Sequence, residues 1–304
     1  MNEFEIIKNF FSKLSLNNKS SLFLNDDVFF DKSKKMIISV DTYIEGVHFI
    51  NFKKPEHVIK KIIRSSISDI ICKGVKPKYY FISGSGNSKS FSKTNIRKIS
   101  KSLKEEQKKY KIQLCGGDTT KSKVLSFTIV SLGFSKKIVY RNKAKLNDDI
   151  YVTGNLGDSF MGLKVLKKKI NLNKKLNDYF EKKYYLPDLQ INFTNKLLDF
   201  ANTSIDISDG LFADLKKLIN KQKISFKLYL NQIPISKNLK NLIFLKRLKK
   251  ISFISRGDDY QILFTASPSK SRIINKCAKS LGIKISKIGK ICNYSTKSQI
   301  LDEK

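Results

Sequence analysis

The side chains best suited to chemistry are aspartates that occur in short polar segments. An Asp lies among Gly, Ser, Thr or a second Asp in five places: NDD (25–27), SVDTYIEGVHF (39–49), SSISD (65–69), GGDTT (116–120) and SIDISDGL (204–211). One such Asp alone is typical of a turn or a helix N-cap. Five in one chain, with no matching set of His or Cys, favour a site that binds several Mg²⁺ ions and phosphate groups, because Mg²⁺ prefers oxygen ligands.

Two of these segments have features that suit phosphate binding. In GGDTT the paired glycines would let backbone N–H groups approach phosphate oxygens, while Asp118 offers a metal ligand. In SIDISDGL, Asp206 and Ser208 alternate as at the end of a strand, and we predict that Asp209 caps the next helix. The N-terminus of that helix would favour an anion.

Two other glycine-containing segments resemble phosphate-binding loops only in part. GSGNSKS (84–90) lacks the spacing of a Walker A loop, and we predict a flexible turn there. GNLGDS (154–159) resembles part of a dinucleotide fingerprint, and a strand-to-helix turn explains it as well. The sequence therefore predicts phosphate chemistry without a P-loop.

The elements that must position these aspartates alternate between strands and helices. A strand over 36–41 ends on Asp41, Pro55 opens a helix that Gly74 closes, and a Lys-rich amphipathic helix covers 91–110. Further strands are predicted at 112–115, 124–134, 149–154, 203–207, 224–230 and 261–266, and further helices at 160–169, 188–202 and 211–221. The pattern predicts an α/β or α+β fold in two mixed domains, with the boundary near 140–148, which we place as 1–142 and 143–304.

Composition limits the classes of protein that fit. The chain has 304 residues, 40% of them hydrophobic, and a net charge of +34. A basic chain could bind nucleic acid, but Lys greatly outnumbers Arg and is spread along the whole sequence, so we expect no specific nucleic-acid partner. No stretch is long and apolar enough to span a membrane, no secretory signal is recognisable, and four dispersed Cys suit a reducing compartment, so we expect a cytoplasmic protein.

The order and spacing of the acidic segments resemble those of the thiamine-monophosphate kinase family. The similar segments are NDD, SVDTYIEGVHF, SSISDIICKGVKP, GGDTT, YRNKAKLNDDIYVTGNLGDS, SIDISDGL and GDDYQILF, which span 25–264. This family belongs to a superfamily with aminoimidazole-ribotide synthetase and selenophosphate synthetase. The resemblance implies an N-terminal domain that dimerises through a shared β-barrel, a C-terminal α/β domain, and ATP bound near the domain cleft and the dimer interface.

The resemblance also implies roles for individual residues. Those implied to hold Mg²⁺ are Asp27, Ser39, Asp41, Asp69, Asp118, Asp206 and Asp209. Those implied to contact ATP are Tyr110, Gly117, Asp118, Arg141 and Ser208, and those implied to contact thiamine phosphate are His48 and Asp258. Other interpretations remain open: His48 as a hydrogen-bonded structural residue, Arg141 as half of a surface ion pair, and Tyr110 as the last core residue of its helix.

The chain departs from the family pattern at several positions. Asn25 stands where the family usually has Gly, Val40 where it has Thr, and Asp258 where it has Glu. The sequence contains no Trp, and the aromatic segment that the family carries at its C-terminus is missing. The last two departures, at Asp258 and at the C-terminus, affect the substrate end more than the nucleotide end.

The reaction that the resemblance implies is ATP-dependent phosphorylation of thiamine phosphate to thiamine diphosphate by in-line transfer. The attacking phosphate oxygen is already anionic, so no covalent nucleophile and no general base are expected, in keeping with a site rich in Asp and poor in His. Two alternatives remain: another ATP-dependent enzyme of the same superfamily that acts on a different small substrate, and a basic nucleic-acid-binding protein.

Overall fold

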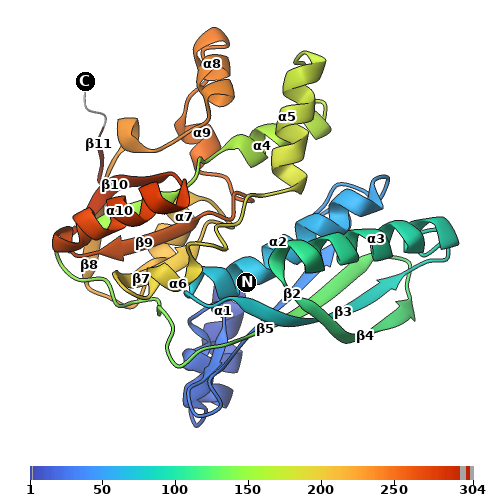
Figure 1. The fold of residues 1–304 in the computed structure, drawn as a ribbon, viewed down its shortest axis with the longest axis horizontal. Coiled ribbons are helices and arrows are strands. Elements are labelled where there is room, and N and C mark those ends of the chain that lie inside the picture. The colour runs from blue at the N-terminus through green and yellow to red at the C-terminus, as the bar shows by residue number, and fades with distance from the viewer. Residues whose placement is uncertain (2, 295–298, 302–304) are drawn as a thin grey trace.

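Two β-sheets and the helices packed against them make up the computed structural model, which describes residues 1, 3–294 and 299–301 (Figure 1). The elements of the first half are α1 (Glu3–Ile6), η1 (Ile7–Phe11), η2 (Ser12–Ser15), η3 (Lys19–Leu24), β1 (Phe29–Asp31), β2 (Met36–Ile44), α2 (Pro55–Cys72), β3 (Pro77–Gly86), α3 (Lys93–Tyr110), β4 (Gln113–Lys121) and β5 (Ser126–Phe134). Those of the second half are β6 (Asp149–Thr153), α4 (Asp158–Leu166), α5 (Lys174–Tyr185), α6 (Thr194–Leu197), β7 (Ala201–Asp206), α7 (Leu211–Leu218), β8 (Ile224–Tyr229), η4 (Leu230–Gln232), α8 (Lys237–Leu245), α9 (Ile251–Ile254), β9 (Ile262–Ala266), η5 (Pro268–Lys270), α10 (Ser271–Leu281), β10 (Ile285–Asn293) and β11 (Gln299–Leu301).

The first sheet has five strands in the order β1-β2-β5-β3-β4. Its strands are antiparallel except for β3 and β4, which are parallel and are joined through α3. Helices α2 and α3 lie on one face of this sheet (Figure 1). On the other face Val40, Phe81 and Phe134 are 61%, 39% and 48% exposed, so this face presents apolar side chains to solvent.

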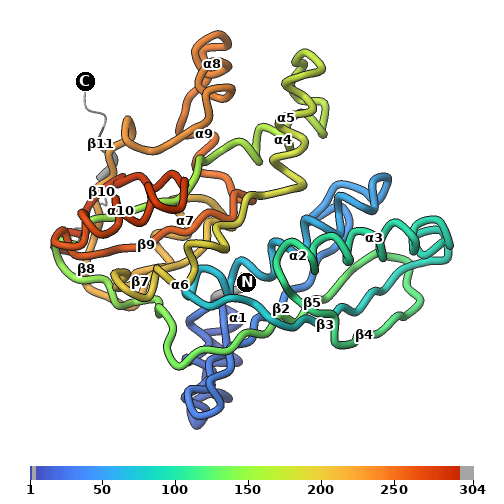
Figure 2. Tube along the Cα trace, viewed as in Figure 1, coloured from blue at the N-terminus to red at the C-terminus, as the bar shows by residue number. Residues whose placement is uncertain are grey.

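The second sheet has six strands in the order β11-β8-β10-β6-β9-β7. The chain reaches it from β5 through residues 135–148 (Figure 2). The pairs α4–α5 and α8–α9 extend away from this sheet (Figure 1). The resulting fold is mixed α/β, as the sequence predicts.

Helix α2 is the central element of the molecule. Pro55 occupies its first turn, where the missing N–H costs nothing, and the apolar side chains that follow are buried, among them Ile59, Ile63 and Ile67. The core that they join also contains Tyr151, Phe193 and Phe264 from the second half. One apolar core therefore runs from the first sheet to the second, and the predicted boundary near 140–148 stays a prediction.

Most predicted elements are confirmed, with ends that differ by a few residues. The strand at 36–41, the helix opened by Pro55 and the helix over 91–110 appear as β2, α2 and α3. The predicted helix over 188–202 is wrong, because α6 covers Thr194–Leu197 and Ala201 already begins β7. Several elements are not predicted from the sequence, among them β3, α5, α8, α10 and β10.

One predicted strand is longer than expected, and one predicted turn is partly a strand. The strand predicted at 112–115 continues through GGDTT as β4, and the first three residues of GSGNSKS, Gly84–Gly86, complete β3. The glycines have a structural reason, because a side chain at Gly117 would place its Cβ 1.7 Å from the carbonyl oxygen of Ile82 on the neighbouring strand. GNLGDS, in contrast, is the predicted strand-to-helix turn, with Gly157 in the left-handed region directly before α4.

Candidate functional site

A cavity of about 650 Å³ collects most of the residues that the sequence singles out. It lies where the end of β2, the last turns of α2 and the end of β7 meet the N-terminal segment. Nine of the predicted site residues line it: Asp27, Asp41, His48, Asp69, Arg141, Asp206, Ser208, Asp209 and Asp258. Ser39 is buried beside it, and its hydroxyl donates to Asp69 (2.7 Å) and to Asp41 (3.2 Å).

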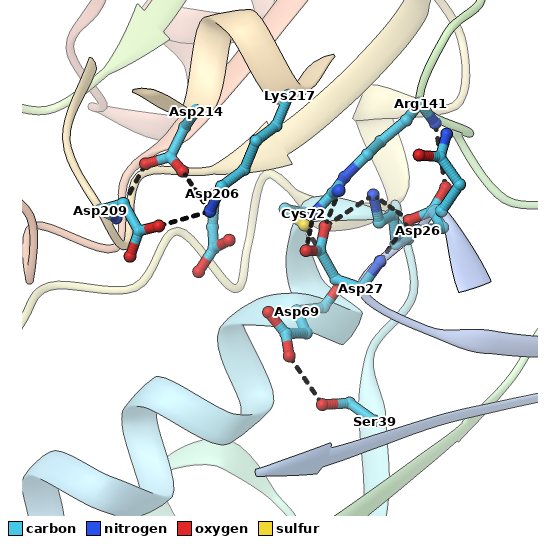
Figure 3. Close-up of polar contacts among 12 residues, drawn as sticks. Asp26, Asp27, Ser39, Asp69, Cys72, Arg141, Asp206, Asp209, Asp214 and Lys217 are labelled. Carbon is cyan, nitrogen blue, oxygen red and sulfur yellow. Dashed lines mark hydrogen bonds and ion pairs between the residues drawn. The ribbon is translucent and has the colours of Figure 1, made fainter. Parts of the chain in front are cut away.

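The carboxylates at the centre of this cavity are held by short side-chain contacts (Figure 3). The Ser68 hydroxyl donates to Asp206, which is 2% exposed at the end of β7. Burial raises the pKa of Asp41 and that of Asp206 to about 6, and burial together with the neighbouring carboxylates raises the pKa of Asp69 well above its ordinary value. These carboxyl groups are therefore close together and desolvated, so a nearby cation would stabilise their ionised forms.

Two cationic side chains contact Asp26 and Asp27, the 26–27 pair. The Arg141 guanidinium pairs with Asp27, with Nε 3.0 Å from Oδ2, and the Arg141 backbone N–H donates to Asp26 over 3.0 Å. The Lys73 ammonium lies 2.6 Å from Asp26 and 3.2 Å from Asp27. Arg141 is thus half of an ion pair, but the pair is buried at the cavity and not on the surface, where a phosphate could still reach its side chain.

The set of donors suits a hard divalent cation. Oxygen ligands predominate, and ligand atoms of Asp27, Cys72 and Asp206 all lie within 4.8 Å of one another. Asp41 and Asp69 lie beside them, and burial, with neighbouring carboxylates in the case of Asp69, raises their pKa values. This donor set would suit an ion such as Mg²⁺.

Asp209 does not cap the next helix, so this prediction is wrong. The N-cap of α7 is Gly210, and Asp214 in the first turn accepts the backbone N–H groups of Asp209 and Gly210 (2.9 and 3.0 Å). The Asp214 carboxylate thus holds the two residues that precede the helix, and no side-chain hydrogen bond caps α7 at Gly210. The exposed Asp209 side chain instead pairs with Lys217 over 2.6 Å.

The other end of the cavity holds His48 and Asp258. Partial burial lowers the pKa of His48, and its Nδ1 accepts the Ile44 N–H over 3.0 Å. Asp258 accepts the Tyr260 hydroxyl (2.9 Å) and pairs with the buried Lys61 ammonium (2.9 Å). At pH 7 His48 is therefore neutral, with its proton on Nε2 available to donate.

The loop that carries Asp258 lies unusually close to the end of β7. Asp258 has φ of 67°, in the left-handed region, and its N–H donates to the Ser208 carbonyl over 2.9 Å. A Cβ at Gly257 would stand 1.6 Å from that same carbonyl oxygen, so only glycine fits there. This contact holds the predicted substrate residue beside the predicted ATP residue Ser208.

Besides Ser39, three predicted site residues do not line the cavity. Asp118 and Gly117 are exposed on β4, and the pairings Asp41↔Ile129, Ile129↔Ile82 and Ile82↔Gly117 separate them from Asp41 by three strand spacings. At ~4.8 Å per spacing that is about 14 Å, too far for both carboxylates to bind one ion. Tyr110 is buried in the first core at the end of α3, which agrees with its alternative interpretation.

Three residues that contact this site have no predicted role. Asp26 is the other acid of the NDD segment, Lys73 directly follows the apolar end of α2, and Lys61 lies about three turns earlier among buried isoleucines. A lysine in an otherwise buried helical stretch is the signal that would have identified both lysines, because such an ammonium needs a partner.

Known proteins are similar to this chain over almost its whole length. Residues 25–134 match the family model AIR synthase related protein, N-terminal domain. The chain is 36% identical over 297 residues to thiamine-monophosphate kinase of Buchnera aphidicola subsp. Schizaphis graminum, covering 95% of this chain and 91% of the relative. It is 31% identical over 301 residues to thiamine-monophosphate kinase of Haemophilus influenzae, covering 96% and 89%.

Solved structures show the same similarity in three dimensions. The structure of AaThiL complexed with AMPPCP and TMP matches with a TM-score of 0.85 and 26% identity, over 99% of this chain and 93% of that one. Thiamine monophosphate kinase from Aquifex aeolicus matches with a TM-score of 0.83 and 26% identity, over 100% and 99%. Among the described residues of this chain, no helix is long and apolar enough to cross a membrane.

Proposed function

Because this chain belongs to the thiamine-monophosphate kinase family, we infer that it transfers the terminal phosphoryl group of ATP to thiamine phosphate, forming thiamine diphosphate and ADP. The observation that carries this inference is the cavity in which four buried or half-buried carboxylates adjoin Arg141 at one end and His48 with Asp258 at the other. A nucleotide and a second phosphate ester can thus approach the same group of metal ligands.

The main obstacle to this reaction is repulsion between two polyanions. Asp27, Asp41, Asp69 and Asp206, with Ser39 beside them, would hold Mg²⁺, which supplies the charge that neutralises and aligns the phosphate groups. Arg141 can add a guanidinium to the nucleotide end once Asp27 binds a metal ion. The acceptor is an anionic phosphate oxygen, so the chain needs no general base, and the neutral His48 serves as a hydrogen-bond donor.

Specificity for thiamine phosphate would come from the other end of the cavity. His48 Nε2–H can donate to an oxygen of the substrate phosphate, while the carboxylate of Asp258 can accept a hydrogen bond from the organic part of the substrate. An ion pair with Lys61 and a hydrogen bond from the Tyr260 hydroxyl hold the Asp258 side chain in place. This arrangement favours a substrate that brings both a phosphate and a hydrogen-bond donor.

A homodimer would complete the site. The open face of the first sheet exposes Val40, Phe81 and Phe134, and β4 is an exposed edge strand, as expected of a surface that pairs with a second copy. We propose that the GGDTT segment, which lies about 14 Å from Asp41 within one chain, reaches the cavity of the partner subunit.

We also propose that the protein acts in the cytoplasm.

Mixing two inactive variants tests this arrangement. The purified Asp118→Asn and Asp206→Asn proteins are mixed in equal amounts, unfolded together and refolded. If each site combines both chains, a heterodimer keeps one intact site, and random pairing restores about a quarter of wild-type activity. No recovery in a mixture that contains heterodimers would contradict the shared site.

Product analysis tests the reaction itself. Purified protein is incubated with ATP, Mg²⁺ and thiamine phosphate, and the nucleotides and thiamine species are separated by chromatography. We expect equal amounts of ADP and thiamine diphosphate. ADP formation with aminoimidazole precursors but not with thiamine phosphate would instead assign the chain to another activity of the superfamily.

A further inference from the structure

Lys73 is a buried ammonium at the inner end of the acidic cluster. Its side chain is fully buried at the C-cap of α2, directly after Cys72. Nζ lies 2.6 Å from Asp26, 3.2 Å from Asp27 and 3.1 Å from the Ser204 carbonyl oxygen of β7. Three oxygen atoms therefore surround it, and two of them belong to carboxylates.

The position of this ammonium resembles that of a bound cation. It contacts Asp27, whose carboxylate also lies within 4.8 Å of ligand atoms of Cys72 and Asp206. Arg141 contacts Asp27 as well, but Arg141 is 9% exposed and lines the cavity, so ATP can reach it. Lys73 does not line the cavity, and ATP therefore cannot displace it from Asp26.

We propose that Lys73 is a built-in cation of the acidic cluster, which positions Asp26 and Asp27 without a metal ion and lowers the affinity of the cluster for free divalent ions. The proposal rests on the proposed function only in that the cluster binds Mg²⁺. A fixed positive charge keeps the carboxylates of the 26–27 pair together when no nucleotide is bound. It also repels free ions, so that metal enters mainly with ATP, whose phosphates supply the missing negative charge.

Removal of the charge gives opposite effects on stability and on metal affinity. In Lys73→Met the metal-free protein has an unpaired Asp26 and should unfold at a lower temperature than wild type. The same variant should bind Mn²⁺, used as a probe for Mg²⁺, at least about tenfold more tightly, because a positive charge a few Å from the ion no longer opposes it. A residue with a merely structural role would lower stability without tightening metal binding.

The experiment measures free Mn²⁺ by electron paramagnetic resonance during titration of metal-free protein, with no nucleotide present. Thermal unfolding is recorded in parallel with and without Mg²⁺. We expect Mg²⁺ to raise the unfolding temperature of Lys73→Met more than that of wild type. Lys61→Met is the matched control, because Lys61 is equally buried on the same helix but pairs with Asp258 outside the cluster; it should lose stability and keep wild-type Mn²⁺ affinity.

A second variant covers a failure of Lys73→Met to fold. Lys73→Gln removes the charge and retains an amide that can donate to Asp26, and it should show the same tighter Mn²⁺ binding. Unchanged or weaker binding in the folded neutral variants overturns the proposal. If wild type itself binds no Mn²⁺ and makes no thiamine diphosphate, the proposed function fails instead, so the two failures are distinguishable.

Discussion

Replacing Asp206 by Asn should make the metal-free protein more stable. The carboxylate is 2% exposed, and burial raises its pKa from 3.8 to about 6. Between these pH values the folded protein keeps a proton that the unfolded chain releases, so stability falls as the pH rises through this range. Above about pH 6 the full loss of stability is present, and below pH 3.8 there is none. Asn avoids this loss, and its side-chain oxygen still accepts the Ser68 hydroxyl.

The size of the effect follows from the two pKa values. A difference between 3.8 and about 6 corresponds to about 3 kcal/mol at pH 8, and sharing of charge with the neighbouring carboxylates reduces this to the order of 1–3 kcal/mol. For a chain of 304 residues, 1 kcal/mol shifts the unfolding temperature by roughly 2 °C. We therefore expect Asp206→Asn to unfold about 2–6 °C above wild type at pH 8 in EDTA.

Thermal or urea unfolding at pH 4 and pH 8, with EDTA or with Mg²⁺, provides the measurement. The stabilisation should be largest at pH 8 in EDTA, small at pH 4, and reversed by Mg²⁺, which binds the wild-type carboxylate. Asp199→Asn, at an exposed position, removes the same charge and should change little. An Asp206→Asn variant that is less stable than wild type at pH 8 in EDTA would refute the reasoning.

Three further predictions concern other parts of the molecule. Asp118→Asn should reduce kcat by at least about a hundredfold and leave the unfolding temperature of the isolated chain unchanged, because the residue is exposed; steady-state kinetics with calorimetry checks both. Lys61→Met should raise KM for thiamine phosphate more than KM for ATP, since it frees the Asp258 side chain, and equal changes in the two constants would contradict the role of Asp258. Arg64→Ala should lower stability by about 3–5 kcal/mol in urea unfolding, because it leaves Glu106 buried without its two 2.8 Å contacts, whereas a loss below 1 kcal/mol would mean that water reaches Glu106.

The sequence predicts the aspartates of the cavity well because each lies within or at the end of a regular element. Asp41 is within β2, Asp69 is in the last turn of α2, and Asp206 ends β7. The patterns that locate these elements are local, so the residues at their ends are located too. The resemblance to a family supplied what no local pattern contains, namely that elements 28 and 137 residues apart meet at one cavity.

What the sequence does not predict depends on contacts between distant segments. The GGDTT segment has the composition of a turn, but pairing with β3 makes it a strand. Asp209 is a residue type that often caps helices, but Gly210 is the N-cap of α7, and the Asp209 carboxylate pairs with Lys217 instead. The role of Lys73 depends on Asp26, which lies 47 positions earlier and gives no sign of the pairing.

The apolar core that crosses from the first sheet to the second has a consequence for how this protein can be divided. A break near 140–148 would separate Ile59 and Ile63 from Tyr151 and Phe264, which belong to the same core. Each fragment would then expose a broad apolar surface and depend on the other for solubility. The two halves therefore fold as one unit. Replacing one half by that of a relative would give a folded protein only if the core residues of both halves came from the same protein.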